Sequence, residues 1–194
     1  QHHPKHQPYT SAMYFSAILL TLAATASAVD VRAYSNSGCN GGWVGCAGIN
    51  PGVCCVFSNS ASSGRLSVSV NAIPSSWRIR GEANTGGGCT YLANQQDSNG
   101  NTDICMTYSS RGDRTGGSYS FVGRKRAADN SCPAEQPDGG KCEAGVKPDL
   151  LGLSDGTVYN IADLSDEKVE ELEKIANTGA GADAVPAEFE PLRR

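Results

Sequence analysis

Short runs of alternating apolar and polar residues recur along the first two thirds of the chain. Such alternation is typical of strands that bury one face. Clusters of Gly, Asn and Ser separate the runs, and Asn99-Gly100 is a hairpin-turn signal. The pattern predicts an all-β sandwich or barrel, with strands near residues 29–34, 66–70, 77–80, 104–108 and 118–122.

One stretch near the C-terminus instead has the spacing of an amphipathic helix. Ser165 precedes it as a candidate N-cap, and acidic residues follow in the first turn. We therefore expect one helix at about residues 166–176. A lone helix of this length is marginal in water, so it must dock on something or remain partly disordered. Its apolar stripe would consist of Val169, Leu172, Ile175 and Ala176.

A third pattern, an apolar stretch at residues 17–24, is too short to span a bilayer. It ends in Ala-Ser-Ala at 26–28, the small-x-small motif that signal peptidase accepts. We interpret residues 13–28 as a signal peptide that is cleaved after Ala28. Residues 1–12 are interpreted as translated upstream sequence, with translation starting at Met13. We expect a secreted, extracellular product.

Charge divides the rest of the chain at Lys125-Arg126. Residues 29–126 hold nine Lys and Arg against five Asp and Glu, whereas residues 127–194 hold six against fifteen. An asymmetry this large suggests two pieces with different jobs. Kexin-type secretory proteases cut after such dibasic pairs in exposed loops. We expect residues 127–194 to be an acidic, largely irregular tail or pro-segment, which docks on the basic core and separates from it after secretion.

The eight cysteines indicate disulfides, because their spacing lacks the close pairs of a zinc site and the chain is exported. Both pieces hold an even number, so each can pair internally. The pairing itself stays open. The core would hold Cys39, Cys46, Cys54, Cys55, Cys89 and Cys105, and the tail Cys132 and Cys142.

The mature chain would contain no histidine, since all three histidines precede Met13. This excludes a Ser-His-Asp triad, a Cys-His nucleophile pair and a His-ligated zinc. A small carboxylate-pair hydrolase remains the less favoured alternative. We expect a protein that is not an enzyme and carries no cofactor. The core acids, none of them in a recognisable motif, are Asp30, Glu82, Asp97, Asp103 and Asp113.

One segment has oxygen-bearing side chains at alternate positions, like the start of a calcium loop. Gly100 and Tyr108 do not match the later positions of such a loop. A polar hairpin turn is therefore the preferred interpretation, and calcium is a weak alternative. The weak calcium candidates are Asp97, Asn99, Asn101 and Asp103.

Trp43 is the candidate contact residue, because it follows glycines in a loop between two cysteines. The alternative is a packed aromatic that covers a disulfide. The core has no basic cluster with stacking aromatics, so no nucleic-acid partner is expected. We expect a monomer whose partner is an extracellular protein, a wall polysaccharide or a membrane surface.

The layout of the mature chain resembles fungal small secreted cysteine-rich proteins, a group that includes candidate effectors. This resemblance implies a non-enzymatic binding, toxin-like or effector-like protein that acts outside the cell by surface recognition. It is carried by residues 31–34, Cys39, Cys46, Cys54-Cys55 and the tail segments 155–161 and 184–189.

The core alone resembles βγ-crystallin-type domains, a fold shared by some microbial killer toxins. Residues 34–41 look like that family's aromatic hairpin, with Cys39 in place of the second aromatic. Residues 67–80 resemble the strand-loop-strand that enters a second key, and residues 58–63 nearly match its calcium-binding segment. The resemblance implies a small disulfide-bonded Greek-key sandwich. It also implies the alternative function of a calcium-stabilised structural or cell-wall protein.

Overall fold

The computed structural model describes residues 28–108, 112–123 and 145–194 of the chain. The two earlier ranges contain β1 (Val29–Tyr34), β2 (Trp43–Ile49), β3 (Cys54–Val56), β4 (Ser67–Asn71), β5 (Ile79–Thr85), β6 (Tyr91–Asp97), β7 (Ile104–Met106) and β8 (Gly116–Phe121). The last range adds β9 (Gly145–Val146), β10 (Leu150–Gly152), β11 (Val158–Asn160), α1 (Asp166–Asn177) and the 3-10 helices η1 (Ala182–Ala184) and η2 (Ala187–Leu192). The predicted all-β class with one α-helix is confirmed.

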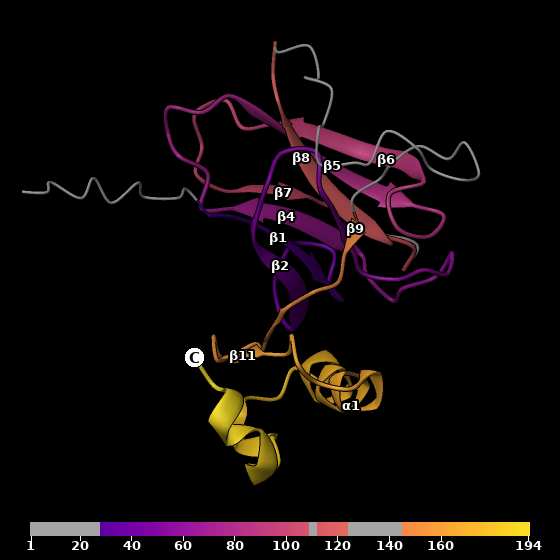
Figure 1. The fold of residues 1–194 in the computed structure, drawn as a ribbon, viewed down its shortest axis with the longest axis vertical. Coiled ribbons are helices and arrows are strands. Elements are labelled where there is room, and N and C mark those ends of the chain that lie inside the picture. The colour runs from indigo at the N-terminus through magenta and orange to yellow at the C-terminus, as the bar shows by residue number, and fades with distance from the viewer. Residues whose placement is uncertain (1–27, 109–111, 124–144) are drawn as a thin grey trace, which may run out of the picture.

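The strands form two sheets that pack face to face (Figure 1). Sheet A has the order β11-β10-β2-β1-β4-β7, and sheet B has the order β6-β5-β8-β3-β9. In β1–β4 and again in β5–β8, the fourth strand lies beside the first, as in a Greek key. The third strand of each run crosses to the opposite sheet. The segment at residues 67–80 contains β4, the last strand of the first run, and the first residues of β5, which opens the second run.

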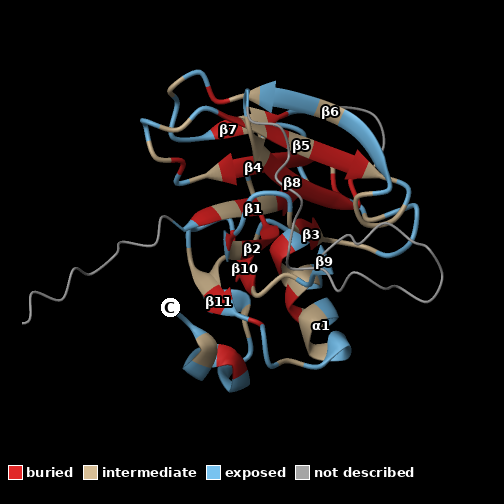
Figure 2. Cartoon of the chain, turned by 45° about the horizontal axis from the view of Figure 1, so that its top comes forward, coloured by how far each residue is buried: buried red, intermediate tan, exposed pale blue. Residues whose placement is uncertain are grey.

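Alternation along the strands explains the core between the sheets. Val31, Ala33, Val68 and Val70 occupy alternate positions of β1 and β4 and are fully buried. Tyr119 on β8 reaches the same core, and its hydroxyl donates to the carbonyl oxygen of Ile49 at 2.9 Å. Figure 2 shows this buried layer in red, with β6 exposed at the edge of sheet B.

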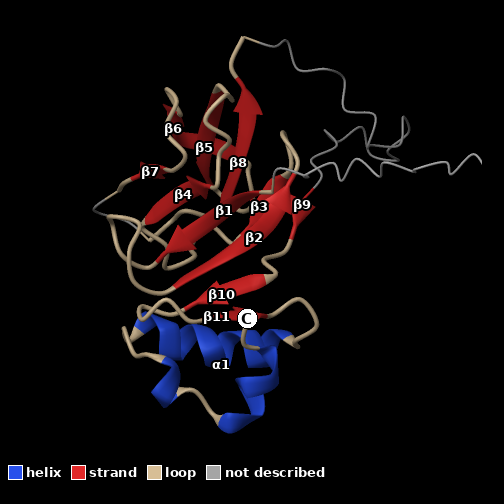
Figure 3. Ribbon diagram, turned by 90° about the vertical axis from the view of Figure 1, so that its left-hand side faces the viewer, coloured by secondary structure: helices blue, strands red, loops and turns tan. Residues whose placement is uncertain are grey.

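Residues 145–194, which we call the C-terminal cap, extend both sheets. β10 pairs with β2 and β11 pairs with β10, while β9 runs parallel to β3. All the helices gather at this end of the molecule (Figure 3). The sequence predicts a largely irregular tail, and here the structure differs. Strands of two or three residues are too short to show a pattern, but they pair the open edges of β2 and β3.

The helix appears where the sequence predicts it. The Ser165 hydroxyl accepts from the backbone N–H of Lys168 at 3.4 Å, and Glu170 pairs with Lys174 at 3.1 Å. The helix docks through buried Leu172 and Ala176, which makes it part of a second core. This second core also contains Val44, Leu151, Leu153, Tyr159, Ile161 and Phe189.

The Asn99-Gly100 turn does not close a hairpin, contrary to the sequence-based expectation. Both residues have positive φ angles, 50° and 88°, as a tight turn requires. The turn, however, leads from β6 in sheet B to β7 in sheet A, so it connects the two layers. Within the described ranges, no helix combines the length and apolar character needed to cross a membrane.

Candidate functional site

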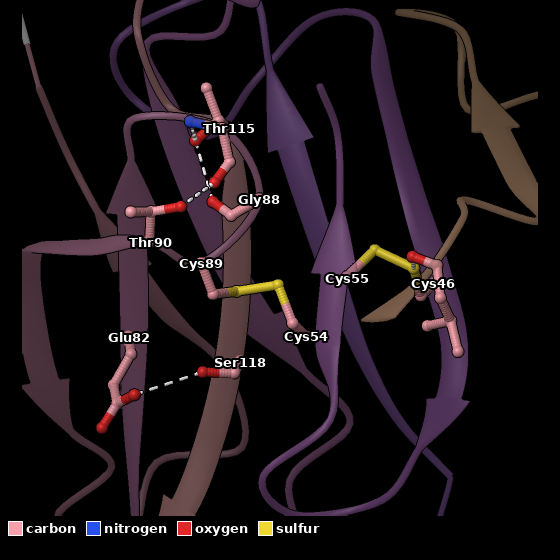
Figure 4. The surroundings of a disulfide bond; sticks show 11 residues. Cys46, Cys54, Cys55, Glu82, Gly88, Cys89, Thr90, Thr115 and Ser118 are labelled. Atoms are coloured by element: carbon pink, nitrogen blue, oxygen red, sulfur yellow. Dashed lines mark hydrogen bonds between the residues drawn. A yellow bond between two sulfur atoms is a disulfide. The ribbon is translucent and has the colours of Figure 1, made fainter. Parts of the chain in front are cut away.

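The adjacent residues Cys54 and Cys55 of β3 point to opposite faces of sheet B, because strand side chains alternate. Cys55 bonds to Cys46 of β2 and so joins the two sheets through the core. Cys54 bonds to Cys89, in the loop between β5 and β6 (Figure 4). All six core cysteines form disulfides, as predicted, and the third bond joins Cys39 to Cys105. Cys132 and Cys142 lie outside the described residues.

Polar side chains line the solvent-facing side of sheet B, opposite its buried face. The strand register aligns Arg80 of β5 with Ser120 and Asp97, and Glu82 with Ser118 and Gln95. Two rows of three polar residues therefore cross three neighbouring strands. We call this surface the polar face, and it consists of Arg80, Glu82, Gln95, Asp97, Ser118 and Ser120.

Hydrogen bonds hold the charged groups of the polar face in position. Arg80 donates from Nε and Nη2 to the two carboxylate oxygens of Asp97, at 2.6 and 3.2 Å. This bidentate contact lowers the pKa of Asp97, and the carboxylate in turn raises the pKa of Arg80. The Ser118 hydroxyl donates to Glu82 Oε2 at 3.2 Å (Figure 4). The face is preorganised with one cation and two acidic groups.

A shallow cavity of about 370 Å³ opens on one end of the polar face. Its polar lining comes from Arg80, Glu82, Gln95 and Ser120, and its apolar lining from the end of β8. There, Phe121 packs against Trp77 with ring centroids 4.9 Å apart. The volume lies in the range of small-molecule sites. The cavity could thus take a ligand that is mostly polar and has one apolar face.

Two carboxyl groups of this face bear on the acid–base chemistry that it could perform. A carboxylate-pair hydrolase needs one carboxylic acid with a raised pKa, which can donate a proton. The two carboxyl groups nearest the cavity are Glu82 and Asp97. The contact with Arg80 lowers the pKa of Asp97, so this group does not fit the role of proton donor, and both of its oxygens are engaged by Arg80.

Trp43, the contact residue proposed from the sequence, is only 7% exposed. Its indole packs over Gly152, where a Cβ would overlap the ring, and the guanidinium of Arg32 lies 4.2 Å from the ring centroid. Tyr34 and Leu150 complete the cluster. A side chain enclosed in this way offers little surface to a partner. The alternative of a packed aromatic therefore describes Trp43, which belongs to a cluster on the outer side of sheet A against which the disulfide-bonded Cys39 packs.

The calcium candidates lie at and after the end of β6, and their carboxylates have different protein partners. Asp97 binds Arg80, whereas Asp103 accepts from the side chain of Asn71 at 2.9 Å and the backbone N–H of Ala72 at 3.3 Å. These contacts lower the pKa of Asp103. In the part of the chain that the structure describes, no three His, Cys, Asp or Glu side chains gather where they could hold a metal ion.

Of the processing residues, only Ala28 lies within the described ranges. It is exposed and directly precedes the buried Val29, the first residue of β1. Cleavage after Ala28 would therefore leave β1 whole. The proposed signal peptide up to residue 27 and the dibasic pair Lys125 and Arg126 lie outside the described residues.

Comparisons with known proteins place the chain among secreted fungal proteins. A family model described as an N-terminal domain matches residues 30–149, which ends one residue before β10. A protein of Arthroderma benhamiae described as "Uncharacterized secreted protein" is 25% identical over 174 residues, covering 88% of this chain and 87% of that protein. No solved structure matches the chain. The likeness to crystallins and killer toxins finds no support in these comparisons.

With three disulfides in its described residues and a secreted relative, the chain is a secreted, extracellular protein.

Proposed function

The chain belongs to the ARB_05566_N family, and from that premise we propose that it is a secreted, non-enzymatic binding protein of the toxin or effector type. It acts outside the cell by surface recognition, and the polar face is its recognition surface. The partner is a component of a cell surface: an extracellular protein, a wall polysaccharide or a membrane.

One observation carries this proposal: the polar face is rigid and, apart from the buried Ser118, accessible to solvent. Gln95 is exposed on the edge strand β6, while hydrogen bonds fix Arg80 to Asp97 and Ser118 to Glu82. The Cys54–Cys89 bond ties β3 to the loop that leads into β6. Rigid side chains lose little conformational freedom on binding, so more of the contact energy appears as affinity.

The absence of catalysis is part of the proposal. Its support is the ionised state of Asp97, which removes one of the two carboxyl groups near the cavity from the role of proton donor. Both carboxylate oxygens of Asp97 also accept hydrogen bonds from Arg80, so this group is already engaged where a nucleophile or base would need a free oxygen.

The test compares two glutamines that are neighbours on β6. Gln95 lines the cavity, whereas Gln96 pairs with Gly81 in the next row and its side chain alternates to the other side of the strand. Protein purified from culture medium is incubated with insoluble wall material, lipid vesicles and intact cells. We expect saturable retention on one of these surfaces, which Gln95→Ala weakens and Gln96→Ala leaves unchanged. Retention on none of them, or equal loss in both variants, would contradict the proposal.

A further inference from the structure

We propose that the polar face binds an uncharged oligosaccharide, as found in cell-wall polysaccharides, without hydrolysing it. This inference rests on the proposed function and names the class of ligand for the same site. It is argued from the groups that line the cavity, from their charge and from its shape.

The first argument is the type of side chain. The cavity collects three planar polar groups, the guanidinium of Arg80, the carboxylate of Glu82 and the amide of Gln95, with the Ser120 hydroxyl beside them. Planar groups present pairs of donors or acceptors at a fixed spacing. Neighbouring hydroxyls on a sugar ring can donate to one such group and accept from the next. A mixed set of donors and acceptors in one small cavity is what a polyhydroxylated ligand needs.

The second argument is electrostatic. The Asp97 carboxylate already accepts two charge-assisted hydrogen bonds from Arg80. With Glu82 added, the surface holds two carboxyl groups against one guanidinium, and its net charge is negative when both are ionised. Phosphate, sulfate and uronate groups would be repelled, and the acidic headgroups of a membrane likewise. A neutral ligand avoids this repulsion and still hydrogen-bonds to both signs of charge.

The third argument is shape. The cavity is shallow and open, and its volume of about 370 Å³ is near the lower end for small-molecule sites. Val122, which is 41% exposed, forms an apolar end beside the polar groups. A sugar ring has the matching character, with hydroxyls at its rim and C–H groups on its faces. An open cavity also lets a longer chain continue across the sheet on either side.

Isothermal titration calorimetry of the purified protein with short, soluble, uncharged oligosaccharides tests this inference. The panel contains oligomers of glucose, N-acetylglucosamine, mannose and xylose, with sulfated forms of the same sugars as charged comparisons. We expect saturable binding of at least one neutral oligomer, weaker binding of its sulfated form and little dependence on salt concentration. Gln95→Ala should weaken the affinity about tenfold, the effect of losing one hydrogen bond of ordinary strength. Gln96→Ala should leave the affinity unchanged.

Failure of this inference can be told apart from failure of the proposed function. If the protein is retained on a surface in a Gln95-dependent manner but no neutral oligomer binds or competes, the ligand is not an oligosaccharide and only this inference is overturned. New reducing ends in the oligomer samples would overturn binding without hydrolysis. Equal affinity in the Gln95→Ala variant would overturn the assignment to the polar face.

Discussion

The inner face of sheet A is covered in two different ways along its width. One row of side chains runs across the whole face: Met106, Val68, Ala33, Val44, Leu151 and Tyr159. Sheet B covers the first three of these residues, which belong to the core between the two sheets. Helices α1 and η2 cover the other three, which belong to the second core. Partly buried Phe57 packs against both.

The two halves differ in what holds them. All three disulfides of the described residues lie between Cys39 and Cys105, within the sandwich. The described part of the cap is held by strand pairing, apolar packing and one buried ion pair, in which Arg65 contacts Glu173 of α1 at 3.1 Å. The cross-links therefore stabilise the half that carries the polar face. The cap closes the open edges of β2 and β3 without a covalent bond of its own in these residues.

The largest loss of stability is expected from removing the Cys39–Cys105 bond of the sandwich. It closes a loop of 66 residues, so the double variant Cys39→Ser, Cys105→Ser should lower the free energy of unfolding by about 4 kcal/mol. The Cys46–Cys55 bond spans only 9 residues and should contribute about 2.5 kcal/mol. Urea unfolding measures both. If removing either disulfide leaves the free energy of unfolding unchanged, the disulfides do not make the sandwich more stable than the cap.

The next largest loss of stability is expected from a substitution that creates a cavity in the cap. Leu172 is fully buried under β2 and β10, so Leu172→Ala should cost about 3 kcal/mol. Ile79→Ala, also at a fully buried position, is the matched change in the sandwich. Amide hydrogen exchange should show faster opening of α1 in the first variant, with the sandwich strands still protected. Equal acceleration in both halves would mean that the cap and the sandwich unfold as one unit.

A smaller effect is expected from the ion pair that joins the two halves. Arg65 is 4% exposed, and burial lowers its pKa while Glu173 opposes that shift. Glu173→Gln leaves the guanidinium buried without its counter-charge and should cost about 2 kcal/mol, less than for a fully buried pair because Glu173 is 31% exposed. Glu170→Gln on the same helix breaks only an exposed pair and should cost less than about 0.5 kcal/mol. Thermal unfolding measures the loss of stability in both variants. Equal losses would mean that the contact between Arg65 and Glu173 does not stabilise the attachment of the cap.

The smallest expected effect is a pH dependence of the sandwich core. Burial raises the pKa of Tyr119 to about 12. In the unfolded chain the phenol ionises near pH 10, so the folded state holds more protons between these values. The stabilisation is complete below about pH 10 and is lost as the pH rises toward 12. Tyr119→Phe should flatten this decline in urea unfolding at alkaline pH. If the loss of stability at alkaline pH is unchanged in this variant, another group causes it. Tyr159 is one such group, because burial raises its pKa as well.

Much of this molecule was readable from local patterns. Local patterns locate β1, β4, β7 and β8 but only the first two residues of β5, and the N-cap and apolar stripe locate α1. The strand β2 was missed because Gly45 and Gly48 interrupt its alternation, and β6 because its residues are mostly polar. The pairing of β10 with β2 joins residues about a hundred positions apart, and three-residue strands give no local signal of such a partner.

The candidate site was harder to predict than the fold. Arg80 and Glu82 on β5, like Ser118 and Ser120 on β8, alternate with buried residues, which indicates one solvent-facing side. Local alternation cannot show that these strands are neighbours. The glycines before Trp43 and its place between two cysteines predict a contact residue, but they do not show what the indole packs against. The nearby Gly152, distant in sequence, is what lets the indole pack flat against the sheet.

Hydroxyl-radical footprinting of the protein bound to insoluble wall material tests the central claim most directly, because it reports which half of the molecule faces the partner. The account predicts protection of the exposed Val122 beside the polar face, with unchanged labelling of Val185 and Leu192 in the cap. Protection confined to the cap, with full labelling of Val122, would contradict it.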